Sequence, residues 1–337
     1  MRLADFDYEF PHERIAQTPI APRDAARLLV DRGSAAAEHR HVNELADILR
    51  PGDLLVVNET KVIPARLPLL RATGGRAEVL MLEPLDGERK LWEALVRPAR
   101  KLRPGEVLLA PDGTPAVEIG KRTEAGDTFT VTLLGSVDSL DLLAEYGEMP
   151  LPPYITERLA DPDRYQTIYA HHPGSAAAPT AGLHFTDELL DRLARIGVER
   201  AKVDLVVGLD TFRPITEDDP LEHRMHSERY RVPEETIRLC READRVVAVG
   251  TTSVRALESA AARGELEGRT DIFIHRGFDW QVVDVLMTNF HMPRTTLLMM
   301  IDAFVGDRWR ALYDLAVGAD YRFLSFGDAM LLDRHAP

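Results

Sequence analysis

The stretch Val-Ala-Val-Gly-Thr-Thr-Ser-Val-Arg, residues 247–255, is the part of the sequence that decides the fold class. An apolar run of strand length ends at Gly250, and small hydroxyl residues then open the helical pattern of residues 256–264. A strand that passes directly into a helix is the repeating unit of α/β domains. Backbone amides at such a helix start bind carboxylates or phosphates, unless the hydroxyls simply cap the helix. The candidate binding residues are Gly250, Thr251, Thr252, Ser253 and Arg255, the last as a bidentate partner for a carboxylate.

The flanking text repeats this alternation of strand and helix. Helical periodicity predicts helices over residues 41–50 and 186–197, the second capped by Thr186, and around Cys240. The apolar run LLVVN, residues 54–58, predicts a strand that is buried on both faces. Further apolar runs predict strands at residues 201–209, 245–250, 270–275 and 282–290. We therefore expect a layered α/β domain built from both ends of the chain, residues 1–65 and 151–337.

The segment between these two parts has a different pattern. From Ala65 to Leu142, short β-like runs are separated by turns rich in Gly, Pro and Asp, and helical periodicity is weak. Regularly spaced short strands with turn signals are typical of a small barrel or sandwich. We predict an inserted small β-barrel domain at residues 66–150.

Composition limits the function classes. Lys and Arg number 41 against 55 Asp and Glu, so the formal net charge is −14. This balance argues against broad electrostatic binding of nucleic acid but permits a local basic patch. The single cysteine excludes an intramolecular disulfide and fits a reducing compartment. No apolar run is long enough to span a membrane and the first residues lack an apolar signal core, so we expect a cytoplasmic protein.

Three further motifs carry candidate chemistry. In PTAGLHFT, residues 179–186, His184 stands at a loop–helix junction, where a histidine acts as an acid or base or has a structural role. In TNFHMP, residues 288–293, Asn289 and His291 follow an apolar strand, where polar groups line ligand crevices or complete a turn. In YRFLSFGDAM, residues 321–330, Asp328 and the aromatic rings either pack structurally or cover a bound base.

Two clusters of residues are candidates for ligand sites, one of them for a metal ion and the other for RNA. His223 and His226, flanked by Glu222 and Glu228, lack a third ligand at convincing spacing, so we predict no metal site. Basic residues gather in and beside the inserted domain, as an RNA-contacting patch or as a solvated hairpin. The predicted RNA-binding residues are Lys61, Arg66, Arg97, Arg100, Lys101 and Arg103.

The ordered set of motifs resembles the S-adenosylmethionine:tRNA ribosyltransferase-isomerase family. The matching text spans almost the whole chain and includes DFDYEFP (5–11), GDLLVVNETKVIPARL (52–67), GEMPLPPYI (147–155), APTAGLHFT (178–186), EHRMHSERY (222–230), VGTTSVRALES (249–259), TNFHMP (288–293) and YRFLSFGDAM (321–330). Each motif alone is weak evidence, whereas the ordered set is specific.

The resemblance implies an α/β domain interrupted by a β-barrel and a defined reaction. The ribosyl part of S-adenosylmethionine is transferred to 7-aminomethyl-7-deazaguanine at the tRNA wobble position and rearranges to an epoxycyclopentane, while adenine and methionine leave. S-adenosylmethionine would be a consumed substrate and no other cofactor is expected. The partners would be tRNA and S-adenosylmethionine, and the family suggests a monomer.

This chemistry requires a general base, because a proton must leave the carbon next to the sulfonium. The candidates are His184 and His291, with Asp328 less favoured. The methionine carboxylate needs donors, which Thr251, Thr252, Ser253 and Arg255 can supply. We expect three more residues in the S-adenosylmethionine site, namely Thr180, Gly182 and Asn289.

Three positions depart from the family pattern. Family members usually carry Asn at the position of Glu59, His at that of Val206 and Gly at that of Asp210. These changes motivate a second hypothesis, a ribosyl transferase with a different amine acceptor. A non-catalytic RNA- or nucleotide-binding protein is the third hypothesis, and a metal-dependent hydrolase is the least favoured.

Overall fold

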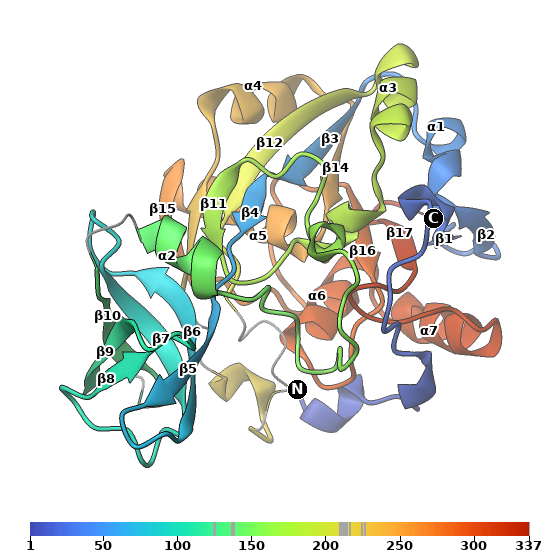
Figure 1. Cartoon of the computed structure of the whole chain (residues 1–337). Helices are drawn as coiled ribbons and strands as arrows, with labels where there is room; N and C mark the ends of the chain where they lie inside the picture. Colours follow the sequence, from blue (N-terminus) through green and yellow to red (C-terminus); the bar gives the residue numbers. More distant parts are fainter. Residues whose placement is uncertain are drawn as a thin grey trace. The chain divides into compact units, whose positions relative to one another are not determined.

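The computed structural model describes residues 1–123, 126–135, 139–208, 215, 217–223, 225 and 227–336 (Figure 1). The chain divides into two compact units. The α/β unit comprises Met1–Thr60, Pro152–His172 and Ala178–Pro337, and the barrel unit comprises Lys61–Leu151 and Pro173–Ala177. No helix in these described ranges is both long and apolar enough to cross a membrane.

The α/β unit is built on one mixed sheet. Within the described residues it has nine strands in the order β15-β13-β12-β3-β14-β16-β17-β1-β2. Their bounds in that order are Glu267–Thr270, Glu228–Arg231, Glu199–Leu205, Asp53–Asn58, Arg245–Val249, Val285–Asn289, Ala329–Asp333, Arg27–Val30 and Glu38–His41. The four central strands β12, β3, β14 and β16 run parallel, whereas β17 is antiparallel to β16. The carboxyl ends of four parallel strands therefore meet at one edge.

Helices cover this sheet because their apolar faces need burial. The helices of the α/β unit are α1 Leu45–Ile48, α3 Asp187–Arg195, α4 Glu234–Glu242, α5 Thr251–Arg263, α6 Thr296–Val305 and α7 Arg308–Gly318, whereas α2 Ser139–Tyr146 belongs to the barrel unit. Short 3-10 helices lie at Leu3–Phe6, His12–Arg14, Arg23–Ala25, Val42–Glu44, Pro162–Tyr165, Thr180–His184 and Pro220–Glu222. A separate pair of strands is β4 Thr60–Val62 with β11 His172–Ser175.

The core confirms the sequence-based reading of β3 and α3. All six residues of β3 are buried, as expected for a central strand with a continuous apolar run. Its Leu55 and Val57 belong to a cluster that includes Leu189 and Leu193 of α3. The Thr186 hydroxyl accepts the Leu189 amide at 3.2 Å, so the predicted cap is confirmed.

The barrel unit contains a closed barrel whose strand order is β10-β7-β6-β5-β8-β9. The strands in chain order from β5 are Arg66–Arg71, Arg76–Pro84, Leu91–Arg97, Val107–Leu109, Pro115–Arg122 and Phe129–Leu133. Alternation decides which side chains point inward: Trp92, Ala94 and Val96 of β7 are buried and their neighbours are not. The predicted fold class, an α/β domain from both chain ends with an inserted β-barrel, is confirmed.

Two local predictions were wrong. The strand expected at residues 270–275 lies instead at Glu267–Thr270, because the Thr270 hydroxyl accepts the Ile272 amide at 3.1 Å and turns the chain. The helix expected at residues 41–50 is shorter, a 3-10 turn at Val42–Glu44 followed by α1. The residues after α1 lead directly to β3, which leaves no room for another helical turn.

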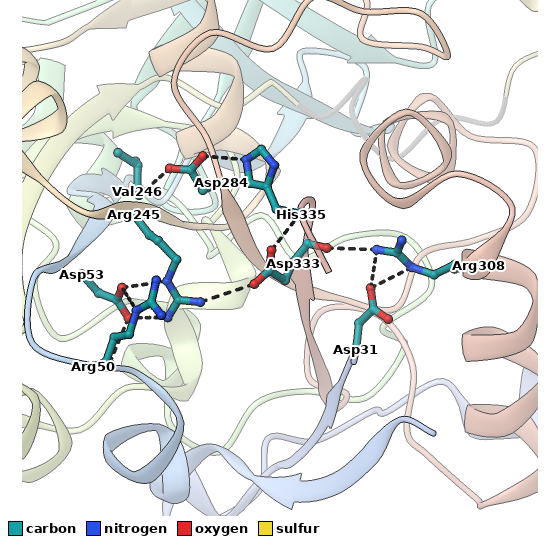
Figure 2. Close-up of polar contacts among 9 residues, drawn as sticks. All are labelled: Asp31, Arg50, Asp53, Arg245, Val246, Asp284, Arg308, Asp333 and His335. Carbon is teal, nitrogen blue, oxygen red and sulfur yellow. Dashed lines mark hydrogen bonds and ion pairs between the residues drawn. The ribbon is translucent and has the colours of Figure 1, made fainter. Parts of the chain in front are cut away.

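Charged groups join the strands at the edge opposite the carboxyl ends of β3, β14 and β16 (Figure 2). Arg245, which begins β14, donates to both oxygens of Asp53, which begins β3, at 2.8 and 2.7 Å. It also donates to Asp333, which ends β17, at 3.3 Å. Arg308 of α7 donates to Asp31 at 2.9 Å. This edge is therefore held together by ion pairs.

Candidate active site

A cavity of about 630 Å³, partly open to solvent, lies in the α/β unit. Residues at or just beyond the carboxyl ends of β12, β14 and β16 line it, the expected place for a ligand in an open α/β sheet. The principal polar lining residues are Thr180, Thr251, Thr252, Thr288, Asn289 and His291. The principal apolar ones are Ala178, Val207, Phe290, Met292, Leu297 and Leu324.

The start of α5 forms one wall of this cavity. Gly250 has φ +85°, a conformation that favours glycine, and leads into Thr251 and Thr252 without a side-chain cap. The Thr252 hydroxyl is buried and has no hydrogen-bond partner in the described part of the chain. The capping explanation therefore does not account for these hydroxyls. An uncapped helix start beside an unpartnered hydroxyl suits an anionic group, above all a carboxylate.

The next residues of α5 have partners of their own. The Ser253 hydroxyl donates to the Val249 carbonyl at 2.8 Å, and Ser253 does not line the cavity. Arg255 is buried one turn further along, where its Nη1 is paired with Glu228. Its Nε and Nη2 are buried without a partner within the described residues. The structure thus separates Thr251 and Thr252, at the cavity, from Ser253 and Arg255 behind it.

Asn289 and Thr180 meet at the end of β16. The Thr180 hydroxyl donates to the Asn289 side-chain oxygen at 2.8 Å, and both residues line the cavity. The Asn289 side-chain nitrogen lies 3.5 Å from the Asp328 carbonyl. This orients the amide so that its nitrogen is the remaining donor.

His291 lines the cavity and is held on three sides. Its Nε2 lies 3.0 Å from the Thr288 hydroxyl, its backbone nitrogen donates to the Tyr313 hydroxyl at 3.0 Å, and its carbonyl accepts from Tyr8 at 2.6 Å. Burial lowers the pKa of His291 to about 3, so the imidazole is neutral. Its Nδ1 has no hydrogen-bond partner in the described part of the chain. The lone pair of a neutral ring that lines a cavity can accept a proton, and the same burial makes this ring a weaker base than a free imidazole.

The other predicted acid–base residues lie outside the cavity lining. Both ring nitrogens of buried His184 lie at backbone oxygens, Nδ1 at 3.0 Å from Ala181 and Nε2 at 2.9 Å from Gly327. The Asp328 carboxylate accepts the amides of Arg27 at 2.9 Å and Arg322 at 2.8 Å. These contacts serve to fix the backbone.

Gly182 also lies behind the cavity, in the short helix Thr180–His184. A Cβ on Gly182 would lie 2.2 Å from the Tyr169 hydroxyl, so close packing requires glycine at this position. Its place in the structure is explained by packing against Tyr169.

The predicted RNA-binding cations are placed in the barrel unit. Arg100, Lys101 and Arg103 are exposed in the turn between β7 and β8, and Lys61 is exposed in β4. The Arg97 side chain is 80% exposed, whereas Arg66 donates to the Leu151 carbonyl at 3.2 Å and lies near Glu78. Five of these six side chains are therefore accessible to a phosphate backbone.

The three departures from the family pattern have different surroundings. Glu59 is buried and lies 3.3 Å from the His172 ring and 3.1 Å from Lys202, whose ammonium group compensates its charge. Val206 donates its amide to the Arg229 carbonyl at 3.0 Å and does not line the cavity, unlike Val207. Asp210 lies outside the described residues.

A metal ion has no ligand set in the described part of the chain, where no three suitable side chains come together. His223 lies 3.1 Å from Glu217, and His226 lies outside the described residues. Cys240 is partly buried in α4, and burial raises the pKa of its thiol to about 12, so it is unsuited to nucleophilic chemistry.

Comparison with known proteins decides the family. The model of the family described as "Queuosine biosynthesis protein" matches residues 3–332. The chain belongs to the queuosine biosynthesis protein family. Among family members, it is 52% identical over 344 residues to the S-adenosylmethionine:tRNA ribosyltransferase-isomerase of Symbiobacterium thermophilum, with 98% of this chain and 100% of the relative covered. The enzyme of the same name from Carboxydothermus hydrogenoformans is 49% identical, with the same coverage.

A solved structure supports the same family assignment. The crystal structure of S-adenosylmethionine tRNA ribosyltransferase from Thermotoga maritima is 39% identical to this chain, with a TM-score of 0.55. The match covers 97% of this chain and 99% of that one.

Sequence reasoning missed several residues of the cavity. Thr288 is the first residue of the motif TNFHMP, and its position next to Asn289 and His291 could have identified it as a lining residue. Tyr154 and Ser325 also stood within quoted motifs, but nothing in their spacing related them to one another; their hydroxyls lie 2.7 Å apart at the cavity.

Proposed function

We propose that this chain is an S-adenosylmethionine:tRNA ribosyltransferase-isomerase. It transfers the ribosyl group of S-adenosylmethionine to 7-aminomethyl-7-deazaguanine at the tRNA wobble position and isomerises it to the epoxycyclopentane of epoxyqueuosine, with release of adenine and methionine. S-adenosylmethionine is a consumed substrate and no other cofactor takes part. The enzyme works as a monomer in the cytoplasm.

The observation that carries this proposal is the cavity at the strand ends, with an uncapped helix start and a neutral imidazole both on its walls. The methionine carboxylate is placed at the amides of Thr251 and Thr252, where the positive end of the helix dipole favours an anion. The apolar wall of Phe290, Leu297 and Leu324 suits the adenine ring. Asn289 remains as a donor to the substrate.

His291 is the proposed general base. Of the three candidates, it alone lines the cavity, whereas His184 and Asp328 use their polar atoms on the backbone. Removal of a proton from the carbon beside a sulfonium creates an ylide-like centre, and a neutral imidazole has the lone pair to accept that proton. Arg255, which was a candidate donor to the carboxylate, is instead paired with Glu228 and does not line the cavity.

The tRNA partner is proposed to contact exposed cations of the barrel unit, at Lys61, Arg97, Arg100, Lys101 and Arg103, with Arg66 at the margin. Contacts to phosphate position an RNA and carry no sequence information. The modified base must leave its stack, which is easier in an anticodon loop than in a duplex.

The deciding experiment incubates the protein with S-adenosylmethionine and tRNA that bears 7-aminomethyl-7-deazaguanine. Adenine release and the mass of the wobble nucleoside are measured together. Adenine with the epoxycyclopentane adduct is the expected result. Adenine without the adduct would contradict the proposal and indicate a ribosyl transferase with a different amine acceptor. Binding of tRNA without either product would indicate a non-catalytic binding protein.

A further inference from the structure

The segment Phe6–Tyr8 is bound to the turn that follows His291 in the cavity wall. The Phe6 carbonyl accepts the Arg294 amide at 3.0 Å. The Asp7 carboxylate is ion-paired with the Arg294 guanidinium. The Tyr8 hydroxyl donates to the His291 carbonyl at 2.6 Å. Phe6, Asp7 and Tyr8 thus hold the backbone between His291 and Arg294, which lies more than 280 positions further along the chain.

This stretch needs external support. Arg294 has φ +57°, in the left-handed region that disfavours a residue with a Cβ. The next residue, Thr295, caps α6 by accepting the Leu298 amide at 3.3 Å, and it lines the cavity. The turn therefore carries backbone strain between two residues of the cavity wall, His291 and Thr295. Such strain persists only where surrounding contacts determine the conformation.

A second tyrosine completes the support of His291. The Tyr313 hydroxyl accepts the His291 amide at 3.0 Å, and the Tyr8 and Tyr313 rings pack edge to face with centroids 5.0 Å apart. The amide and carbonyl of His291 are therefore each bound to one tyrosine of a packed pair. The His291 Nε2 also contacts the Thr288 hydroxyl. The backbone and the ring of His291 are therefore both held, and together these contacts determine the orientation of the imidazole.

We propose that Tyr8 is a positioning residue for the reaction: its hydroxyl holds the His291 backbone, and through it the imidazole, in the geometry needed for proton removal. Tyr8 does not line the cavity, so it acts through His291 rather than on the substrate. The inference rests on the proposed function, because it assigns Tyr8 a part in that reaction.

The test compares Tyr8→Phe with a matched control, Tyr230→Phe. Both changes remove a hydroxyl that donates to a backbone carbonyl, and the Tyr230 hydroxyl bonds Glu265 at 3.0 Å away from the cavity. Tyr8→Phe is expected to lower kcat by about tenfold, because a small misplacement of a catalytic group is costly, while KM for S-adenosylmethionine changes less than about twofold. Tyr230→Phe is expected to keep the wild-type kcat.

A second readout does not depend on turnover. The ring titration of His291 is followed by nuclear magnetic resonance in the wild type and in Tyr8→Phe, with His291→Gln identifying the signal. Loosening of the wall admits water, so the His291 pKa is expected to rise toward its ordinary value in Tyr8→Phe. Asp7→Asn weakens the ion pair that binds the same segment to Arg294, and it is measured in parallel, in case Tyr8→Phe does not fold.

The outcomes are distinguishable. Wild-type kcat with an unshifted His291 titration in both Tyr8→Phe and Asp7→Asn would overturn the positioning role while leaving the proposed function intact. An equal loss of kcat in Tyr230→Phe would also overturn it, since the effect would then be general destabilisation. A wild type that releases no adenine would overturn the proposed function, and with it the role of Tyr8.

Discussion

The Thr180 hydroxyl donates to the side-chain oxygen of Asn289 at 2.8 Å, although 109 residues separate the two in the chain. The bond joins the start of the short helix Thr180–His184 to the end of β16 and orients the Asn289 amide. We expect Thr180→Val to raise KM for S-adenosylmethionine about fivefold, equivalent to about 1 kcal/mol for one hydrogen bond. Thr236→Val is the matched control, because that buried hydroxyl donates to the Lys202 carbonyl at 2.7 Å outside the cavity. An unchanged KM in Thr180→Val would contradict the assignment.

The two buried histidines are expected to respond differently to the same substitution. His291→Gln should lower kcat at least 100-fold, the typical contribution of a general base, with the melting temperature little changed. His184→Gln should retain the catalytic step and lose about 1–3 kcal/mol of stability, because the buried contacts of the ring with the Ala181 and Gly327 carbonyls are disturbed. Single-turnover adenine release and thermal unfolding separate the two cases. The reverse pattern would assign the base to His184.

Acid is expected to destabilise the protein partly through His291. Burial lowers its pKa in the folded state to about 3 from an ordinary value of 6.5. Between these values the unfolded state binds a proton that the folded state does not, so the free energy of unfolding falls as pH falls, by at most about 1.4 kcal/mol per unit. His291→Gln should show a correspondingly shallower fall. Urea unfolding of both proteins across this range checks the difference, and parallel curves would refute it.

The ion pair between Asp53 and Arg245 is expected to be a main contributor to stability (Figure 2). The Asp53 side chain is fully buried, so Asp53→Ala would remove the closest partner of Arg245, leave it paired with Asp333, and should cost about 3 kcal/mol. Asp320→Ala breaks the exposed pair with Arg14 and should cost less than about 1 kcal/mol. Equal losses in chemical denaturation would show that burial is unimportant here.

Charge reversal on the barrel unit is expected to weaken tRNA binding selectively. Arg100→Glu and Lys101→Glu should lower tRNA affinity and reduce the salt slope by about one for each lost phosphate contact. KM for S-adenosylmethionine should not change. Arg241→Glu makes the same charge change on α4 and serves as the control. Filter binding at several salt concentrations measures the slopes, and unaltered slopes would exclude this face as the RNA contact.

The sequence by itself determined the fold class and the family. Hydrophobic periodicity is a local property, and it therefore predicted three features from the sequence alone. These are the strand at LLVVN, the passage from strand to helix at Gly250, and the change to short strands after Ala65. The expected strand at residues 270–275 failed because a short apolar run does not reveal where a side-chain hydroxyl turns the chain.

Only the tertiary structure decided which candidate residues share a cavity. The sequence alone did not separate His184 from His291 as the base and only ranked Asp328 below them. The structure distinguishes them by their contacts: His184 and Asp328 bind backbone groups, whereas His291 lines the cavity. The same applies to Tyr8, whose contact with His291 spans 283 positions. Hydrogen-bond partners and burial arise from packing between distant segments, and local spacing does not encode them.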